Sequence, residues 1–134
     1  MKKKSAFNLK NVPPIKQGLA IVLIILIVSI VCLIIDKRDV MTWNFIIIPL
    51  FLFSVYNPII GILQHKLLPY IGMSCLVFIV LVAFVYFTGN FVSKFPYSQV
   101  QELHTILPTI IIFYIMFHFL SFIFRTALNF LKEI

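Results

Sequence analysis

The residues best suited to chemistry in this sequence follow one another at helical spacing near its C-terminal end. Steps of three or four positions would bring them to one face of a helix, and the set is Tyr114, His118, Ser121 and Arg125. His118 lies inside an apolar run, where an ionisable side chain is a candidate for proton or ligand binding. We favour a neutral His118 that is hydrogen-bonded to Tyr114, Ser121 or a neighbouring helix. Arg125, at the end of the run, is expected to extend its side chain toward water.

A second polar group surrounds two prolines in the middle of the chain. Asn44, Ser54 and Asn57 lie near Pro49 and Pro58. Each proline removes a backbone donor from a helix and leaves a carbonyl four residues earlier without its partner. The polar side chains are close enough in sequence to satisfy these carbonyls, as an apolar medium requires. A broken helix can line an ion or substrate site, but we favour a plain kink.

Elsewhere the sequence lacks the residues for catalysis or cofactor binding. Its carboxylates all flank the apolar runs, so no acid pair lies inside them; they are Asp36, Asp39, Glu102 and Glu133. No spacing typical of a metal site, phosphate loop or nucleophile elbow occurs. Haem would need a second histidine at the depth of His118, and none is expected there. Cys32 and Cys75 are expected at different depths and therefore as free thiols. We expect no enzyme, no metal and no cofactor.

Composition determines the class of element that positions these residues. The chain of 134 residues is 62% apolar and 11% charged, whereas a soluble domain is about 45–50% apolar and 25% charged. This excess excludes a soluble enzyme and a disulfide-stapled secreted domain. A nucleic-acid-binding module is also excluded, because the cations behind the net charge of +7 are scattered along the chain. We predict a single integral membrane domain over residues 1–134.

The apolar runs predict the membrane spans. A helix needs about 20 mostly apolar residues to cross a hydrocarbon layer about 30 Å thick. Four segments meet this requirement, at residues 19–35, 41–63, 67–88 and 103–124. Short connections make consecutive helices antiparallel neighbours. The predicted fold is an all-α membrane protein, an antiparallel up-and-down bundle of four transmembrane helices with a kinked second helix.

The distribution of lysine and arginine predicts the orientation, because these side chains are retained on the cytoplasmic side. Both termini and the connection between the second and third spans share one side, which carries Lys2, Lys3, Lys4, Lys10, Lys16, Lys66, Arg125 and Lys132. The other side carries Lys37, Arg38 and Lys94. We therefore expect both termini in the cytoplasm, and we expect the location to be the bacterial inner membrane. The arm 1–16 is expected to lie on the inner surface. The loop 89–102 is expected along the outer headgroups, with docking to a partner as the alternative.

Small and polar residues predict the faces that turn inward, because helices in a bilayer associate through close approach and hydrogen bonds. The first span carries such a stripe at Gly18, Ser29, Cys32 and Asp36. The second carries one at Asn44, Phe51, Ser54, Asn57, Gly61 and Gln64. The third carries Gly72, Cys75, Ala83 and Tyr86, and the fourth continues its stripe to Asn129. We expect these faces to hold the bundle together or to hold it to a partner.

Three functions fit this architecture. The sequence contains no motif of a small four-span family that would favour one of them. The leading hypothesis is a non-catalytic accessory or assembly subunit of a larger membrane complex, which binds lipid and other membrane subunits or itself. The second is a small oligomeric channel or carrier that uses the second and fourth helices. The third is a membrane-embedded immunity or inhibitor protein that binds another protein's helices.

Overall fold

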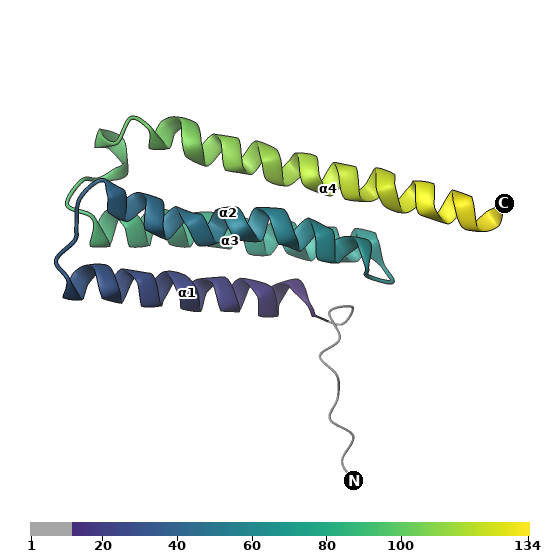
Figure 1. Ribbon diagram of the computed structural model, residues 1–134, viewed down its shortest axis with the longest axis horizontal. Helices are drawn as coiled ribbons and strands as arrows, with labels where there is room; N and C mark the ends of the chain where they lie inside the picture. The colour runs from purple at the N-terminus through teal and green to yellow at the C-terminus, as the bar shows by residue number, and fades with distance from the viewer. Residues whose placement is uncertain (1–11) are drawn as a thin grey trace, which may run out of the picture.

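The computed structural model describes residues 12–134 as four long helices (Figure 1). They are α1 (Pro14–Ile34), α2 (Met41–Ile62), α3 (Leu67–Val92) and α4 (Leu103–Glu133), with a short 3-10 helix η2 (Tyr97–Gln99) before α4. All four α-helices are long and apolar enough to cross a membrane. The predicted all-α class, with four helices long and apolar enough to span a membrane, is therefore confirmed. The predicted inner arm falls largely on residues 1–11, which lie outside the described part of the chain.

Helix α1 begins five residues earlier than the predicted span. Pro13 has an extended conformation and Pro14 is the first helical residue, a position where a missing backbone donor costs nothing and the fixed φ favours the helix. The two prolines therefore mark the start of α1. Helices α3 and α4 also continue beyond their predicted ends, to Val92 and Glu133.

Helix α2 is the centre of the arrangement. It packs against α1, α3 and α4, and α1 also packs against α3, whereas α4 packs mainly on α2. The α1–α2 and α3–α4 connections lie at one end of the molecule, here called the loop end (Figure 1). The α2–α3 connection lies at the opposite end, the turn end, and α4 extends beyond it.

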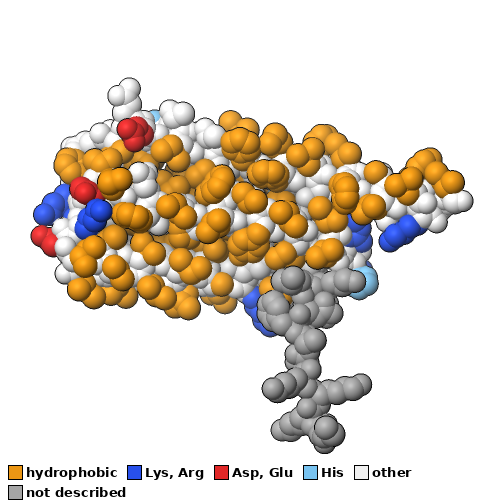
Figure 2. Space-filling model, in the orientation of Figure 1, with side chains coloured by type: hydrophobic (Ala, Val, Ile, Leu, Met, Phe, Trp, Pro, Cys, Tyr) orange, Lys and Arg blue, Asp and Glu red, His pale blue; other side chains and the backbone are white. Residues whose placement is uncertain are grey.

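The surface and the core differ in polarity along the molecule. Hydrophobic side chains cover the long side of the bundle, and charged side chains lie toward its two ends (Figure 2). Near the loop end the core is apolar, with Ile46, Leu50, Leu81 and Val85 almost fully buried. Most of the buried polar side chains lie toward the turn end, among them Gln17, Asn57, Ser74 and His118. An apolar surface with charges at both ends is the distribution expected of a membrane protein.

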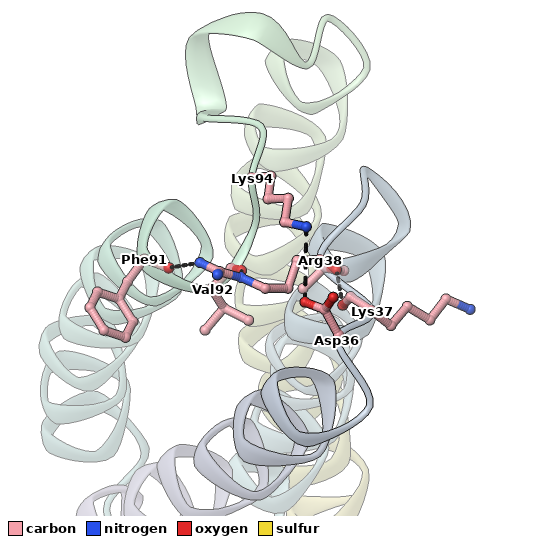
Figure 3. A network of polar contacts seen from close by, with 7 residues as sticks. Asp36, Lys37, Arg38, Phe91, Val92 and Lys94 are labelled. Carbon is pink, nitrogen blue, oxygen red and sulfur yellow. Dashed lines mark hydrogen bonds and ion pairs between the residues drawn. The ribbon is translucent and has the colours of Figure 1, made fainter.

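At the loop end, hydrogen bonds join the α1–α2 connection to the end of α3 and to the residues that follow it (Figure 3). Arg38 donates from Nε to the carbonyl of Val92 at 2.7 Å and from Nη2 to that of Phe91 at 3.3 Å. The N–H of Lys94 donates to the carbonyl of Arg38 at 2.9 Å. Arg38 thus satisfies carbonyls at the C-terminus of α3, which have no partner within the helix. The exposed ion pair between Lys94 and Asp36, at 3.9 Å, adds little because water screens it.

The loop after α3 packs on its own chain. Trp43 donates from Nε1 to the carbonyl of Phe95 at 2.8 Å, and its ring meets that of Tyr97 edge-on, with centroids 6.0 Å apart. Ser93 and Val100 are buried. The segment predicted to follow the outer headgroups therefore folds over the ends of α2 and α3.

A close approach between α3 and α2 makes Gly89 sensitive to substitution. A Cβ atom at Gly89 would overlap the ring of Trp43, which is 1% exposed. We expect Gly89→Ala to destabilise the protein by about 1–3 kcal/mol, the usual cost of overpacking. Gly72→Ala on the same helix is the matched control, because a Cβ there meets nothing within 4 Å. Equal unfolding midpoints for the two variants in detergent would contradict this packing.

Candidate functional site

Four side chains, one from each helix, form a hydrogen-bonded group near the turn end, here called the polar cluster: Gln17, Asn57, Tyr70 and Tyr114. Asn57 of α2 is at its centre and is 0% exposed. Its Nδ2 donates to Oε1 of Gln17 at 2.8 Å, and its Oδ1 accepts from the hydroxyl of Tyr114 at 3.1 Å. The hydroxyl of Tyr70 donates to the backbone carbonyl of Asn57 at 3.0 Å. One asparagine thus connects α2 to all three other helices.

Further hydrogen bonds satisfy the remaining donors and acceptors of the polar cluster. Nε2 of Gln17 donates to the hydroxyl of Tyr70 at 2.9 Å and to the carbonyl of Val12 at 3.1 Å. Nδ2 of Asn57 also donates to the Tyr70 hydroxyl, at 3.0 Å. That hydroxyl therefore accepts two bonds and donates one. Buried polar groups are costly unless they are paired, and here each member pairs with another member.

Three aromatic rings cover the polar cluster on its loop-end side. The ring of Tyr114 stacks on that of Phe78 with centroids 3.9 Å apart. Phe53 stacks on both, at 6.1 Å from Tyr114 and 6.4 Å from Phe78. Phe53 precedes Asn57 by one helical turn, so the rings lie between the polar cluster and the apolar half of the core. This stack separates the polar cluster from the apolar residues nearer the loop end.

His118 is buried without a hydrogen bond. It is 4% exposed, and among the described residues neither Nδ1 nor Nε2 has a partner. Its ring lies edge-on to that of Tyr114, with centroids 4.5 Å apart. The predicted hydrogen bond from His118 to Tyr114, Ser121 or another helix is therefore wrong. Ser121 donates instead to backbone carbonyls, those of Pro58 and Phe117, both at 2.9 Å.

Arg125 caps the C-terminus of α2. Its Nη1 donates to the carbonyls of Ile62, at 3.0 Å, and Gln64, and its Nη2 donates to that of His65 at 3.0 Å. These carbonyls end a helix and have no partner within it, and a cation there also interacts favourably with the helix dipole. The side chain predicted to extend toward water is thus bound to α2. Arg38 has the same role for α3 at the loop end.

The predicted polar residues of α2 occupy different environments. Asn57 and Ser54 are buried, but Ser54 donates to the carbonyl of Phe51 at 2.7 Å and not to a carbonyl freed by proline. Pro58 is buried, and its carbonyl accepts a hydrogen bond from the hydroxyl of Ser121. Asn44 and Phe51 are exposed, so their prediction as part of the inward stripe is wrong within this chain.

The predicted stripe of α3 is also largely wrong as an inward face within this chain. Gly72, Ala83 and Tyr86 are exposed, and Cys75 alone of the four is half-buried against the core. The buried face of α3 instead contains Tyr70 and Ser74. Ser74 lies beside the hydroxyls of Tyr70 and Tyr114, without a hydrogen bond of regular geometry in residues 12–134.

Gln17, Tyr70 and Ser74 are the residues that sequence reasoning missed. A signal for them exists in the spacing of the buried positions. Gln17 begins a series at steps of three or four residues that continues through Ile21, Ile25, Ser29 and Cys32. Tyr70 and Ser74 begin a similar series that continues through Phe78, Leu81, Val85 and Gly89.

The chemistry available to these residues is hydrogen bonding between helices. Residues 12–134 contain no group of three or more His, Cys, Asp or Glu side chains that could hold a metal ion. Cys32 and Cys75 are free thiols. Comparison with protein families, curated proteins and solved structures finds no significant match to this chain. The arrangement of the polar cluster is therefore the main guide to function.

Proposed function

We propose that this chain is a non-catalytic accessory or assembly subunit of a larger complex in a bacterial inner membrane. In this proposal α1 to α4 cross the bilayer as an antiparallel up-and-down bundle, with α2 bent at Pro49 and Pro58. The turn end and both termini face the cytoplasm. The chain contributes a rigid helical surface to its partners and carries out no reaction of its own.

The observation that carries this proposal is the polar cluster with its aromatic cover. Its hydrogen bonds join all four helices through Asn57, which is the arrangement that stabilises helix association in a bilayer. The stack of Phe53, Phe78 and Tyr114 covers the cluster on one side. The buried polar side chains therefore favour packing over conduction through a single chain.

A channel or carrier is the second candidate, and His118 is the observation that favours it. An imidazole buried without a partner is a group that a moving proton could use. The aromatic stack opposes a path through one chain, so an oligomer would have to form the path between copies. Proton flux in liposomes that contain only this chain would favour this candidate.

Purification at native expression level in mild detergent tests the leading proposal. We expect other membrane proteins to co-purify in a fixed ratio, and liposomes that contain only this chain to show no flux above empty liposomes. A chain that purifies only with itself and conducts protons would overturn the proposal.

The proposed orientation is testable by cysteine labelling of intact cells. Ser98 at the loop end and Asn129 near the end of α4 are both exposed. In a background without Cys32 and Cys75, an impermeant maleimide should label Ser98→Cys from outside. It should label Asn129→Cys only after permeabilisation, because the lysines near the turn end keep that side cytoplasmic. The opposite pattern would contradict the orientation.

A further inference from the structure

Helix α4 is held to the bundle along one side. It packs mainly on α2, and three side chains of α4 bond to that helix or its end. Tyr114 donates to the Asn57 side chain, Ser121 to the carbonyl of Pro58, and Arg125 to carbonyls at the end of α2. His118 lies between Tyr114 and Ser121 on the same face of α4 and makes no hydrogen bond to residues 12–134.

The surroundings of His118 suit only a neutral imidazole. The buried and half-buried ionisable groups toward the turn end are Tyr114 and Arg125 of α4, Tyr70 and Cys75 of α3, and Tyr56 of α2, while α1 contributes the uncharged Gln17. The exposed ionisable groups at this end include Lys16, His65 and Lys66. None of these is a carboxylate. The acids Asp36, Asp39, Glu102 and Glu133 lie at or beyond helix ends. A protonated ring would therefore be a buried charge without a counter-ion, which is strongly unfavourable.

We infer that His118 is a pH-sensitive switch for α4: protonation of its ring releases α4 from α2 and α3. The closed arrangement is the one in the structure, in which the neutral ring lies against Tyr114. In the open arrangement the ring meets water or lipid headgroups near the turn end, where it can hold a proton. This inference does not depend on the proposed function, because it concerns the isolated chain.

The linkage between protonation and opening determines the expected size and sign of the effect. An imidazole in water takes up its proton near pH 6.5. Above that pH neither arrangement binds the proton, so the ratio of open to closed chains is constant. Below it the open arrangement alone binds the proton, and the ratio should rise by up to about tenfold per pH unit. Acid therefore opens α4, and neutral pH restores the closed arrangement.

Distance measurements between spin labels on α3 and α4 test this inference. Ile79 of α3 and Ile115 of α4 are exposed, so Ile79→Cys and Ile115→Cys can carry labels in the full chain after Cys32→Ala and Cys75→Ala. In liposomes at pH 7.5 we expect one narrow distance distribution. Between pH 6.5 and 4.5 a second, longer distance should appear and grow, and should disappear on return to pH 7.5.

Variants of the three histidines separate His118 from other causes. His118→Leu should remove the pH response and keep the narrow distance at every pH, and His118→Gln should do the same if leucine disturbs folding. His65→Gln and His104→Gln, which change the two exposed histidines, should retain the response. An unchanged distance in the parent chain down to pH 4.5 would overturn the inference. A full response in both His118 variants would overturn it as well.

Discussion

Replacing Asn57 by leucine is expected to lower the free energy of unfolding by about 2–3 kcal/mol. The side chain makes three hydrogen bonds, to Gln17, Tyr70 and Tyr114. Single hydrogen bonds between membrane helices contribute on average about 0.6 kcal/mol and at most about 1.7 kcal/mol. Leucine would also leave its former partners buried with fewer bonds, which adds to the cost. Unfolding by denaturing detergent, followed by circular dichroism, measures the change.

Asn44→Leu is the matched control for this prediction. Asn44 is on the same helix but exposed, and no hydrogen bond of its side chain occurs within residues 12–134. Its replacement should change the unfolding free energy by less than about 0.5 kcal/mol, as is usual for surface sites. Similar losses for Asn44→Leu and Asn57→Leu would show that Asn57 has no special role in joining the helices.

Arg125→Lys is expected to destabilise the protein by about 1–2 kcal/mol, although it conserves the charge. The guanidinium reaches the carbonyls of Ile62, Gln64 and His65 with two nitrogens. A lysine ammonium has only one nitrogen, so it cannot place two donor nitrogens side by side as the planar guanidinium does. The variant should therefore retain the dipole interaction and lose part of the hydrogen bonding. Thermal unfolding in detergent measures the loss.

Lys132→Gln distinguishes capping from charge alone. Lys132 is an exposed cation on the same helix, beyond the end of α2. Its neutralisation should leave the unfolding temperature nearly unchanged. If Arg125→Lys were as stable as the parent while Lys132→Gln were not, then net positive charge at the turn end would matter and the cap would not.

The four helices could be predicted from the sequence because each one coincides with a long apolar run. Composition alone is enough to locate such a run. The run must be helical, because in lipid every backbone N–H and carbonyl needs a hydrogen-bond partner within the protein. The buried face of α4 was also predictable. Tyr114, His118 and Ser121 are polar residues within the apolar stretch of this helix, and all three are buried.

The polar cluster as a whole was not predicted, for two physical reasons. The predicted first span begins at residue 19 and so leaves Gln17 outside it, whereas α1 begins at Pro14. On α3 the small residues Gly72 and Ala83 suggested a close-packing face, yet they are exposed. The actual face uses Tyr70, whose long side chain reaches a hydroxyl partner that small residues cannot.

The environment of His118 shows a different limit. The spacing of polar residues predicts that its ring lies on the inward face. It does not predict whether a hydrogen-bond donor or acceptor on a neighbouring residue lies within reach of the ring. Ser121 is close along the helix, yet its hydroxyl is bonded to the carbonyls of Pro58 and Phe117. The Ser121 hydroxyl therefore does not pair with the His118 ring, although the two residues are close in sequence.

The mass and composition of the particle that contains this chain, measured by native mass spectrometry after extraction in mild detergent, test the proposed function most directly. We expect a heteromeric particle in which this chain occurs in a fixed ratio to other membrane proteins. We also expect Asn57→Leu to deplete the chain from that particle and Asn44→Leu to leave it unchanged. A particle that contains only copies of this chain would contradict the proposal that it is an accessory subunit.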